Sequence, residues 1–516
     1  MSNSEVGGID APVGEGLDSE SHSQVRGSSL LLAGRVMSSF IGYVTQILII
    51  RYLAKSDYGA FAYALSMVAV LQAAVQLGMD RGLARYVPIF DENKDSGSML
   101  GAMTFVGGLT AALGTMVAVG FWAGRSFIAG NLIEDPAAVA MLAILIVLVP
   151  VDALDNLMVT VLAAFRKTGA IFLRRHVVAP LLKLTAVALL IQTDSTVEFL
   201  AVGYAVAGAL GLVIFGSVLF RYLVGRRQEH SGLGLRFPIR DLATFSLPLL
   251  STDLVFMAIN ASDAVLLEWF GSVSDVAALR AVQPTAKLTQ LVLTSFGVLY
   301  IPFVARLYAR GNHEDVSRRY WQTANWIMIL TLPVLIMCLL FNQEFTTRLL
   351  GEDYADSAIL LGILAGGYYI NAMFGFNGMT LNVYRKVGFL VGINGIALAA
   401  NIGLNVILIP LYGPMGAALG TAGTFLVHNL AKQYGLARKT EVSVAGSETW
   451  RIYAIVAVVA AIATYAGYGL ALSFELRVAL FVALSLAAVA ASRNILNVED
   501  TFPGLGRIPL IKYLVK

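Results

Sequence analysis

Apolar runs of about 20 residues follow one another along most of the chain, separated by short polar stretches and by loops marked with Gly or Pro. A run of this length is what a helix needs to cross a bilayer, where each backbone N–H and C=O must find its partner within the segment. Charged residues make up only 13% of the 516 residues, compared with about 25% in soluble domains. We therefore predict an all-α integral membrane protein.

The apolar runs divide into about 14 expected transmembrane helices. The first seven are expected to begin near Ser29, Tyr58, Ser98, Ala137, Ile171, Thr196 and Ala243. The other seven are expected to begin near Val276, Tyr320, Ala355, Val387, Gly413, Arg451 and Glu475.

Basic residues favour one side of this expected topology. Most of the 36 lysines and arginines fall in alternate loops, and the loops between them hold only Arg51, Lys55, Arg125, Arg348 and Arg477. Because cytoplasmic loops carry an excess of Lys and Arg, we predict a multi-pass protein of the cell membrane with both termini cytoplasmic. The net charge of +3 is too small over this length to indicate a nucleic-acid partner.

Two short segments in corresponding places indicate an internal repeat. YLAKSDYGAFAYA after the first expected span and WFGSVSDVAALRA after the seventh each lead from an outer loop into a helix rich in small residues. Repeated halves are typical of alternating-access transporters, although ordinary loop chemistry also explains the likeness. We expect a disordered cytoplasmic tail (1–28), an N-lobe of six spans (29–223), a basic cytoplasmic linker (224–241), a C-lobe of six spans (242–434), a C-terminal helix pair (435–495) and a cytoplasmic tail (496–516).

Three longer segments occur in order along the chain: RYLAKSDYGAFAYALS, LLGEDYADSAILLGILAGG and LNVILIPLYGPMGAALGTA. Together they resemble the prokaryotic polysaccharide, or O-antigen, flippase family of the multidrug/oligosaccharidyl-lipid/polysaccharide exporter superfamily. The segment from Gly413 to Ala418 is the most telling, and it marks the superfamily better than any substrate. The resemblance implies two pseudo-repeated six-helix lobes in a V around a central cavity, which carry an undecaprenyl- or other polyprenyl-phosphate-linked or dolichyl-phosphate-linked glycan across the membrane.

Polar residues recur along one face of the seventh and of the eighth expected span. Their spacings of three, four and seven residues place each set on one side of its helix: Asp253, Asn260 and Asp263 on the seventh, and Arg280, Gln283, Lys287 and Gln290 on the eighth. Charges inside a bilayer are costly, so they usually face a cavity or a partner. Asp263 and Arg280 lie at similar expected depth and would neutralise each other. Lys287 lies about 10 Å deeper, where the seventh span offers no acidic side chain.

These charges predict a cationic track for an anionic headgroup. In the resembled family the first and eighth spans line the cavity, so Arg35 on the first span would join Arg280 and Lys287 in binding a phosphate or pyrophosphate. Snorkelling of Arg35 towards the lipid headgroups is an equal alternative.

Two carboxylates on the fourth expected span form a separate group. Asp152 and Asp155 follow Pro150 and reach the same expected depth as Lys183 on the fifth span. This spacing favours a structural ion pair. A proton- or sodium-coupling site is the alternative, because carboxylates near a helix break are common in ion-coupled carriers.

The remaining sequence features allow the candidate functions of the chain to be ranked. The one Cys and five His show no metal-ligand spacing, and nucleotide-binding and catalytic motifs are absent from the sequence, so we expect no enzyme activity, metal or cofactor. The leading hypothesis is a flippase whose partners are membrane lipids, a lipid-linked glycan and glycan-assembly enzymes. A multidrug antiporter of the same superfamily is the main alternative, since Asp152, Asp155 and Asp263 would attract cationic drugs. A membrane glycosyltransferase or polymerase ranks lower because the outer loops are short, and a scaffold ranks last because it does not explain the intramembrane charges.

Overall fold

The structure is a computed structural model that describes residues 13–165, 167–227 and 234–496, and within these ranges the chain forms helices and no β-strand. The first half contains α1 (Val13–Tyr52), α2 (Lys55–Gln76), α3 (Met79–Glu92), α4 (Ser96–Asn131), α5 (Pro136–Leu145), α6 (Leu148–Ala164), α7 (Thr168–Ile171), the π-helix η1 (Phe172–Val178), α8 (Ala179–Gln192) and α9 (Val197–Arg227). The second half contains α10 (Ile239–Phe270), α11 (Val273–Ala286), α12 (Thr289–Ala309), α13 (His313–Leu340), η2 (Glu344–Leu350), η3 (Glu352–Ser357), α14 (Ala358–Met373), α15 (Asn377–Val383), α16 (Val387–Tyr412) and α17 (Pro414–Lys439). A final pair follows, formed by α18 (Ser447–Thr464) with η4 (Tyr465–Gly469), and by α19 (Phe474–Leu496).

Membrane-spanning length and composition recur through these helices. Within the described residues, 10 helices are long and apolar enough to cross a membrane, or up to 11 if the bent pair α5 and α6 is one span. The chain is therefore an all-helical, multi-pass membrane protein. The expected number of about 14 spans is not reached by this criterion, because α10, α11 with α12, and α17 fall outside it. The criterion covers the described residues alone, and parts of α10 and α12 lie outside them, so the number of spans is not fixed by this count.

The two halves share one order of continuous and broken helices. Breaks separate α2 from α3 and α5 from α6 in the first half, and α11 from α12 and α14 from α15 in the second. The first break has Leu77 and Gly78 in the left-handed region (φ 50° and 66°), and the last has Gly375 there (φ 61°). Pro284, in the last turn of α11, removes a backbone donor just before the third break. This matched order supports the predicted internal repeat.

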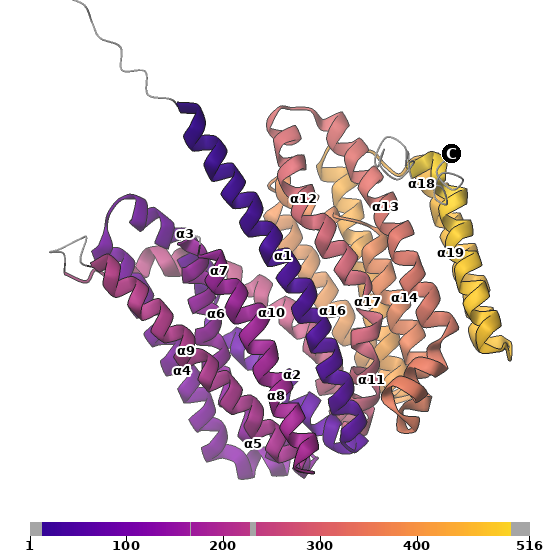
Figure 1. Ribbon diagram of the computed structural model, residues 1–516, viewed down its shortest axis with the longest axis horizontal. Coiled ribbons are helices and arrows are strands. Elements are labelled where there is room, and N and C mark those ends of the chain that lie inside the picture. The colour runs from indigo at the N-terminus through magenta and orange to yellow at the C-terminus, as the bar shows by residue number, and fades with distance from the viewer. Residues whose placement is uncertain (1–12, 166, 228–233, 497–516) are drawn as a thin grey trace, which may run out of the picture.

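The halves form two bundles, the N-lobe and the C-lobe, which diverge towards the end of the molecule where α1 begins and α19 finishes (Figure 1). At the other end, called the closed end below, the lobes touch. Gly59 on α2 lies so near Val273 at the start of α11 that a Cβ would stand 1.9 Å from the Val273 carbonyl oxygen. Lys55 Nζ donates to the Asp353 carbonyl (2.7 Å) across the same junction. The fold thus joins the lobes at the closed end, and elsewhere the first half of α10 packs on α3 of the N-lobe.

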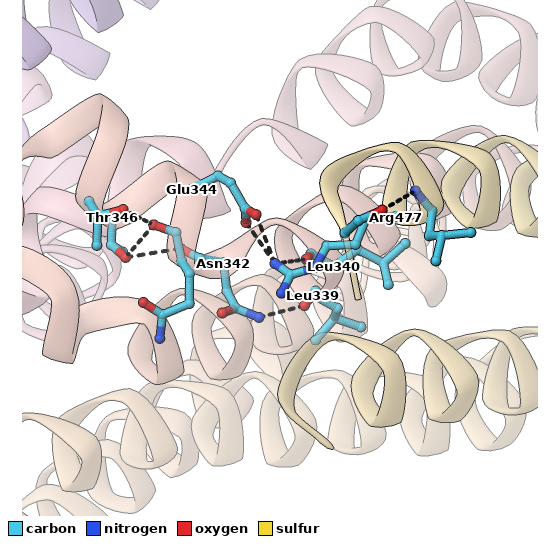
Figure 2. Close-up of polar contacts among 10 residues, drawn as sticks. Leu339, Leu340, Asn342, Glu344, Thr346 and Arg477 are labelled. Atoms are coloured by element: carbon cyan, nitrogen blue, oxygen red, sulfur yellow. Dashed lines mark hydrogen bonds and ion pairs between the residues drawn. The ribbon is translucent and has the colours of Figure 1, made fainter. Parts of the chain in front are cut away.

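The C-terminal helix pair is attached to the C-lobe. In Figure 2, Arg477 at the start of α19 turns towards Glu344 at the start of η2, and its Nη1 lies 2.9 Å from both carboxylate oxygens. The same Nη1 donates to the Leu340 carbonyl at the end of α13 (3.3 Å). Tyr468 in η4 donates its hydroxyl to the Ala358 carbonyl of α14 (3.0 Å). Arg477 and Glu344 are largely buried, so these bonds fix the pair to α13 and α14.

The beginning of the chain differs from expectation. The helix α1 starts at Val13 rather than near Ser29, so the predicted disordered tail is helical from Val13 onwards. A physical reason is that adding a residue to an existing helix costs far less than nucleating one, so a stable span can extend outward. Residues 1–12, 228–233 and 497–516, which include parts of the predicted tails and linker, lie outside the described residues. Each other expected span start has a helix beginning within about two turns of it.

Candidate substrate cavity

A cavity of about 720 Å³ lies between the lobes. Its walls come from α1, α2, the η1–α8 segment and α9 of the N-lobe and from α10 and α11 of the C-lobe. Four of the described lining residues are cationic and none is acidic: Arg175, Lys183, Arg280 and Lys287. Most of the remaining lining is apolar or carries hydroxyl and amide groups. Because low-dielectric walls focus the field of such charges, the cavity attracts anions.

On the C-lobe wall, hydrogen bonds hold Arg280 in place. Its Nη1 donates to Oε1 of Gln283, one turn further along α11 (2.8 Å). Its carbonyl accepts a long bond from Gln46 Nε2 on α1 (3.4 Å), and the same amide donates to the hydroxyl of Tyr58 (2.9 Å). Both Arg280 and Gln283 line the cavity, as the spacing predicted. This polar group connects α1, α2 and α11 across the lobe boundary.

Lys287 lies at the break between α11 and α12. Its N–H closes the last turn of α11 on the Gln283 carbonyl (2.9 Å). Its ammonium lies 5.6 Å from the ring centroid of Tyr368 on α14, within the range of a cation–π contact. Among the described residues it forms no ion pair with a carboxylate. A helix break therefore presents this cation to the cavity.

Asp263 on α10 is almost fully buried (2% exposed) and does not line the cavity. Its Oδ1 has no hydrogen-bond partner among the described residues, and the predicted ion pair with Arg280 is not formed there. Asp263 interacts electrostatically with Lys287 instead. The side chains of Asp253 and Asn260, which were expected on the same face, lie outside the described part of α10.

On the N-lobe wall, the structure adds a residue that the sequence did not single out. In η1, Arg174 is buried (4% exposed) while its neighbour Arg175 is exposed and lines the cavity. Arg174 Nε and Nη2 each lie 2.9 Å from Oδ1 of Asp155 on α6. Asp155 is therefore in an ion pair, but with Arg174 rather than with Lys183. Of these two neighbouring arginines, one is therefore held inside the N-lobe and the other lines the cavity.

The other predicted residues divide between the cavity and its surroundings. Lys183 lines the cavity, lies 5.2 Å from the Tyr204 ring centroid and interacts electrostatically with Asp152. Arg35 is exposed on α1 and is not among the lining residues. Gln290 lies beyond the break, at the start of α12, and is also absent from the lining. Among the described residues no three His, Cys, Asp or Glu side chains gather as a metal-binding group.

Two helical lobes that face each other across a cationic intramembrane cavity define a membrane transporter of the exporter type. The sequence profile described as polysaccharide biosynthesis protein matches residues 24–308, which is more than half of the chain, and the MatE profile matches residues 248–407. The chain therefore belongs to the polysaccharide biosynthesis protein family of the multidrug/oligosaccharidyl-lipid/polysaccharide exporter superfamily, which confirms the resemblance stated above.

Two curated relatives come from archaea. An uncharacterized membrane protein of Methanocaldococcus jannaschii is 21% identical over 418 residues, covering 78% of this chain and 82% of the relative. A probable low-salt glycan biosynthesis flippase, Agl15 of Haloferax volcanii, is 24% identical over 168 residues, or 33% of this chain and 36% of the relative.

Solved structures share the fold. Lipid II flippase MurJ in an inward closed conformation aligns with a TM-score of 0.69 at 14% identity, covering 92% of this chain and all of that chain (100%). A mutant of the Vibrio cholerae MATE transporter VcmN aligns with a TM-score of 0.52 at 14% identity, covering 81% of this chain and 97% of that chain. At these identities the comparison shows the fold alone, and it confirms the all-helical, two-lobed architecture.

Proposed function

We propose that this protein is a flippase that translocates a lipid-linked oligosaccharide or polysaccharide precursor across the cytoplasmic membrane by alternating access. The observation that carries the proposal is the cavity lining, in which Arg175, Lys183, Arg280 and Lys287 face a common space and the described lining contains no carboxylate. The phosphate or diphosphate of a polyprenyl- or dolichyl-linked glycan is a compact anion that guanidinium and ammonium groups bind well at low dielectric. Family membership supports the same class of cargo.

In this proposal the headgroup and its sugars enter between the diverging lobes while the prenyl tail stays in lipid. The positive-inside bias favours cytoplasmic termini, and in this proposal the diverging end of the lobes therefore faces the cytoplasm. The cargo would load from that side. Rocking of the lobes about the cavity would then open the closed end and release the glycan on the opposite face.

A transport assay with Lys287 tests the proposal. Purified protein in proteoliposomes is supplied with a fluorescent polyprenyl-diphosphate-linked oligosaccharide, and translocation is followed by its protection from an external quencher. We expect the wild type to translocate it and Lys287→Gln to slow translocation by about tenfold or more, since a charge-assisted hydrogen bond is lost. Lys439→Gln, which removes an exposed lysine outside the cavity lining, is the matched control. Absence of translocation by a correctly folded wild type, or a fully active Lys287 variant, would contradict the proposal.

A multidrug antiporter is the second candidate, because the MatE profile covers residues 248–407. Such a carrier needs acidic groups that attract a cationic drug and couple it to an ion. Asp155 is committed to Arg174, and Asp263 is buried outside the lining. The two candidates differ in cargo charge, so the same proteoliposomes tested with a fluorescent cationic dye discriminate between them. Dye uptake driven by a proton or sodium gradient would favour the antiporter.

A further inference from the structure

We infer that Arg175 is the phosphate-binding residue of the N-lobe wall, so that the anionic headgroup is held between the two lobes rather than by α11 alone. The inference rests on the proposed function and deepens it. It assigns a binding residue on η1, outside the polar helix faces that the sequence indicated. Its ligand is a phosphate or diphosphate group, whether attached to a lipid-linked glycan or free.

Arg175 lies in a π-helix that borders the cavity. Residues 172–178 form a π-helix, whose i→i+5 hydrogen bonds insert an extra residue per turn and often mark functional sites. Adjacent residues of a helix point in different directions, and here Arg174 is buried in the N-lobe while Arg175 is exposed and lines the cavity. In η1 and α8 the lining includes Ala179 and Lys183, four and eight residues after Arg175, which continue the same face.

Arg174 has no freedom to exchange roles with Arg175. Its guanidinium is bonded to Asp155 through Nε and Nη2 (2.9 Å each) and lies 5.9 Å from the ring centroid of Phe215. Gly211 on α9 makes room for it, because a Cβ there would stand 2.5 Å from Nη2. The nearby carboxylate is thus already in an ion pair. The charge of Arg175 remains uncancelled within the cavity.

Two cations of the N-lobe line the cavity, and among the described residues only Lys183 has a favourable interaction with another side chain. Lys183 contacts the Tyr204 ring and interacts with Asp152, whereas the described part of the chain gives the Arg175 side chain no hydrogen bond or ion pair. A forked guanidinium that is open to solvent and faces an apolar-walled cavity is suited to two phosphate oxygens at once.

The placement of Arg175 has a mechanical consequence. Arg175 moves with the N-lobe, while Lys287 on the opposite wall moves with the C-lobe. An anion bound by both cations offsets their mutual repulsion and favours approach of the walls. A ligand can shift a conformational equilibrium only through such differential contacts. A headgroup that bridges the lobes would therefore favour their closure around it.

Binding measurements on the full-length protein in nanodiscs test the inference. The probes are farnesyl diphosphate, as a short lipid-linked diphosphate, and inorganic pyrophosphate, as the free anion. We expect Arg175→Gln to raise the Kd of both probes about tenfold, because one charge-assisted hydrogen-bonding group is lost, and to flatten the salt dependence of binding. Arg125→Gln, the same change at an exposed arginine outside the lining, is expected to leave both values unchanged. Tighter binding of farnesyl diphosphate than of pyrophosphate identifies the lipid-linked ligand, and equal binding identifies the phosphate alone as the ligand. Wild-type affinity in Arg175→Gln for both probes overturns the inference.

A chemical measurement on the wild type covers the case in which Arg175→Gln does not fold. Phenylglyoxal modification of arginines is followed by mass spectrometry with and without farnesyl diphosphate. Protection of Arg175 with no protection of Arg125 is expected, and modification of Arg175 at an unchanged rate overturns the assignment. The binding test and the transport test can fail separately. A wild type that binds the diphosphate through Arg175 but does not translocate a glycan would refute the flippase and leave the assignment of Arg175 intact.

Discussion

The guanidinium of Arg174 and the carboxylate of Asp155 form an ion pair inside the N-lobe, with Nε and Nη2 both 2.9 Å from Oδ1. Arg174 is almost fully buried, and Asp155 is about one-fifth exposed. The pair joins η1 to α6 and fixes the segment that presents Arg175. It therefore supports the cavity wall without facing the cavity itself.

Removing one partner of this pair is expected to destabilise the protein strongly. Asp155→Asn leaves the buried Arg174 charge uncompensated, which costs about 3–5 kcal/mol in comparable buried pairs. The double variant Arg174→Gln with Asp155→Asn is expected to recover part of this loss, because both charges are gone. The melting temperatures of the single and the double variant are measured by thermal unfolding in detergent. Equal melting temperatures for Asp155→Asn and the wild type would contradict the structural role.

Lys55 is expected to help hold the closed end shut. Its ammonium donates to the Asp353 carbonyl across the lobe boundary (2.7 Å) and lies 5.4 Å from the Tyr354 ring centroid. Because this bond is solvent-exposed, Lys55→Ala should increase opening of that end by at most about fivefold. The readout is labelling of a cysteine at Ser66, a lining residue, by a membrane-impermeant maleimide in a Cys338→Ser background.

The Lys55 measurement has two checks. Lys55→Arg retains a cationic donor and should label like the parent protein. Unchanged labelling in Lys55→Ala from the side of the closed end would show that apolar packing, such as that of Gly59 on Val273, closes this end without the lysine.

Asn429 is expected to stabilise the C-lobe rather than to contact cargo. Its Nδ2 donates to Asn371 Oδ1 (3.0 Å), and its Oδ1 accepts from Asn377 Nδ2 (3.2 Å). Asn429→Leu removes both bonds, and each interhelical bond in a membrane contributes about 0.6 kcal/mol on average. We expect a lower melting temperature with unchanged transport per folded molecule. A transport defect at full stability would instead assign this asparagine to the substrate path.

Asp95 provides a pH-dependent contribution to stability. Its carboxylate caps α4 by accepting from the Ser98 N–H (3.0 Å), and this backbone hydrogen bond holds the pKa of Asp95 below its ordinary value. The stabilisation is present above the unfolded pKa of about 3.9 and is lost as the pH falls through the lower folded pKa. Asp95→Ala should cost about 1 kcal/mol at neutral pH. Melting temperatures are measured from about pH 3 to about pH 7, a range that includes the ordinary pKa of Asp, and are compared with those of Asp95→Asn, which keeps a cap but does not titrate.

Sequence reasoning located the helices because apolar runs of spanning length are a local property of the chain. Arg280, Gln283 and Lys287 line one cavity because α11 is regular up to its break, while their role in binding stays a prediction. Gln290 was expected on the same face, but the break after Lys287 starts a new helix and redirects it. Asp155 pairs with Arg174 rather than with Lys183, and helix spacing alone does not determine which of two nearby cations a carboxylate contacts.

The periodicity of apolar and polar residues does not predict contacts between segments that are distant in the sequence. Nothing in the local pattern around Gly59 indicates that the Val273 carbonyl occupies the place of a side chain. The separation of Arg174 from Arg175 was equally hidden, because consecutive arginines near a span end have the pattern of a cytoplasmic loop.

Because Arg477 is bonded to Glu344, the last two helices are expected to move together with the C-lobe. A fluorophore attached near Leu496 would report the tilt of that lobe. Paired with a dye on the N-lobe helix α4, it would convert each transport cycle into a change in energy transfer that single molecules can display.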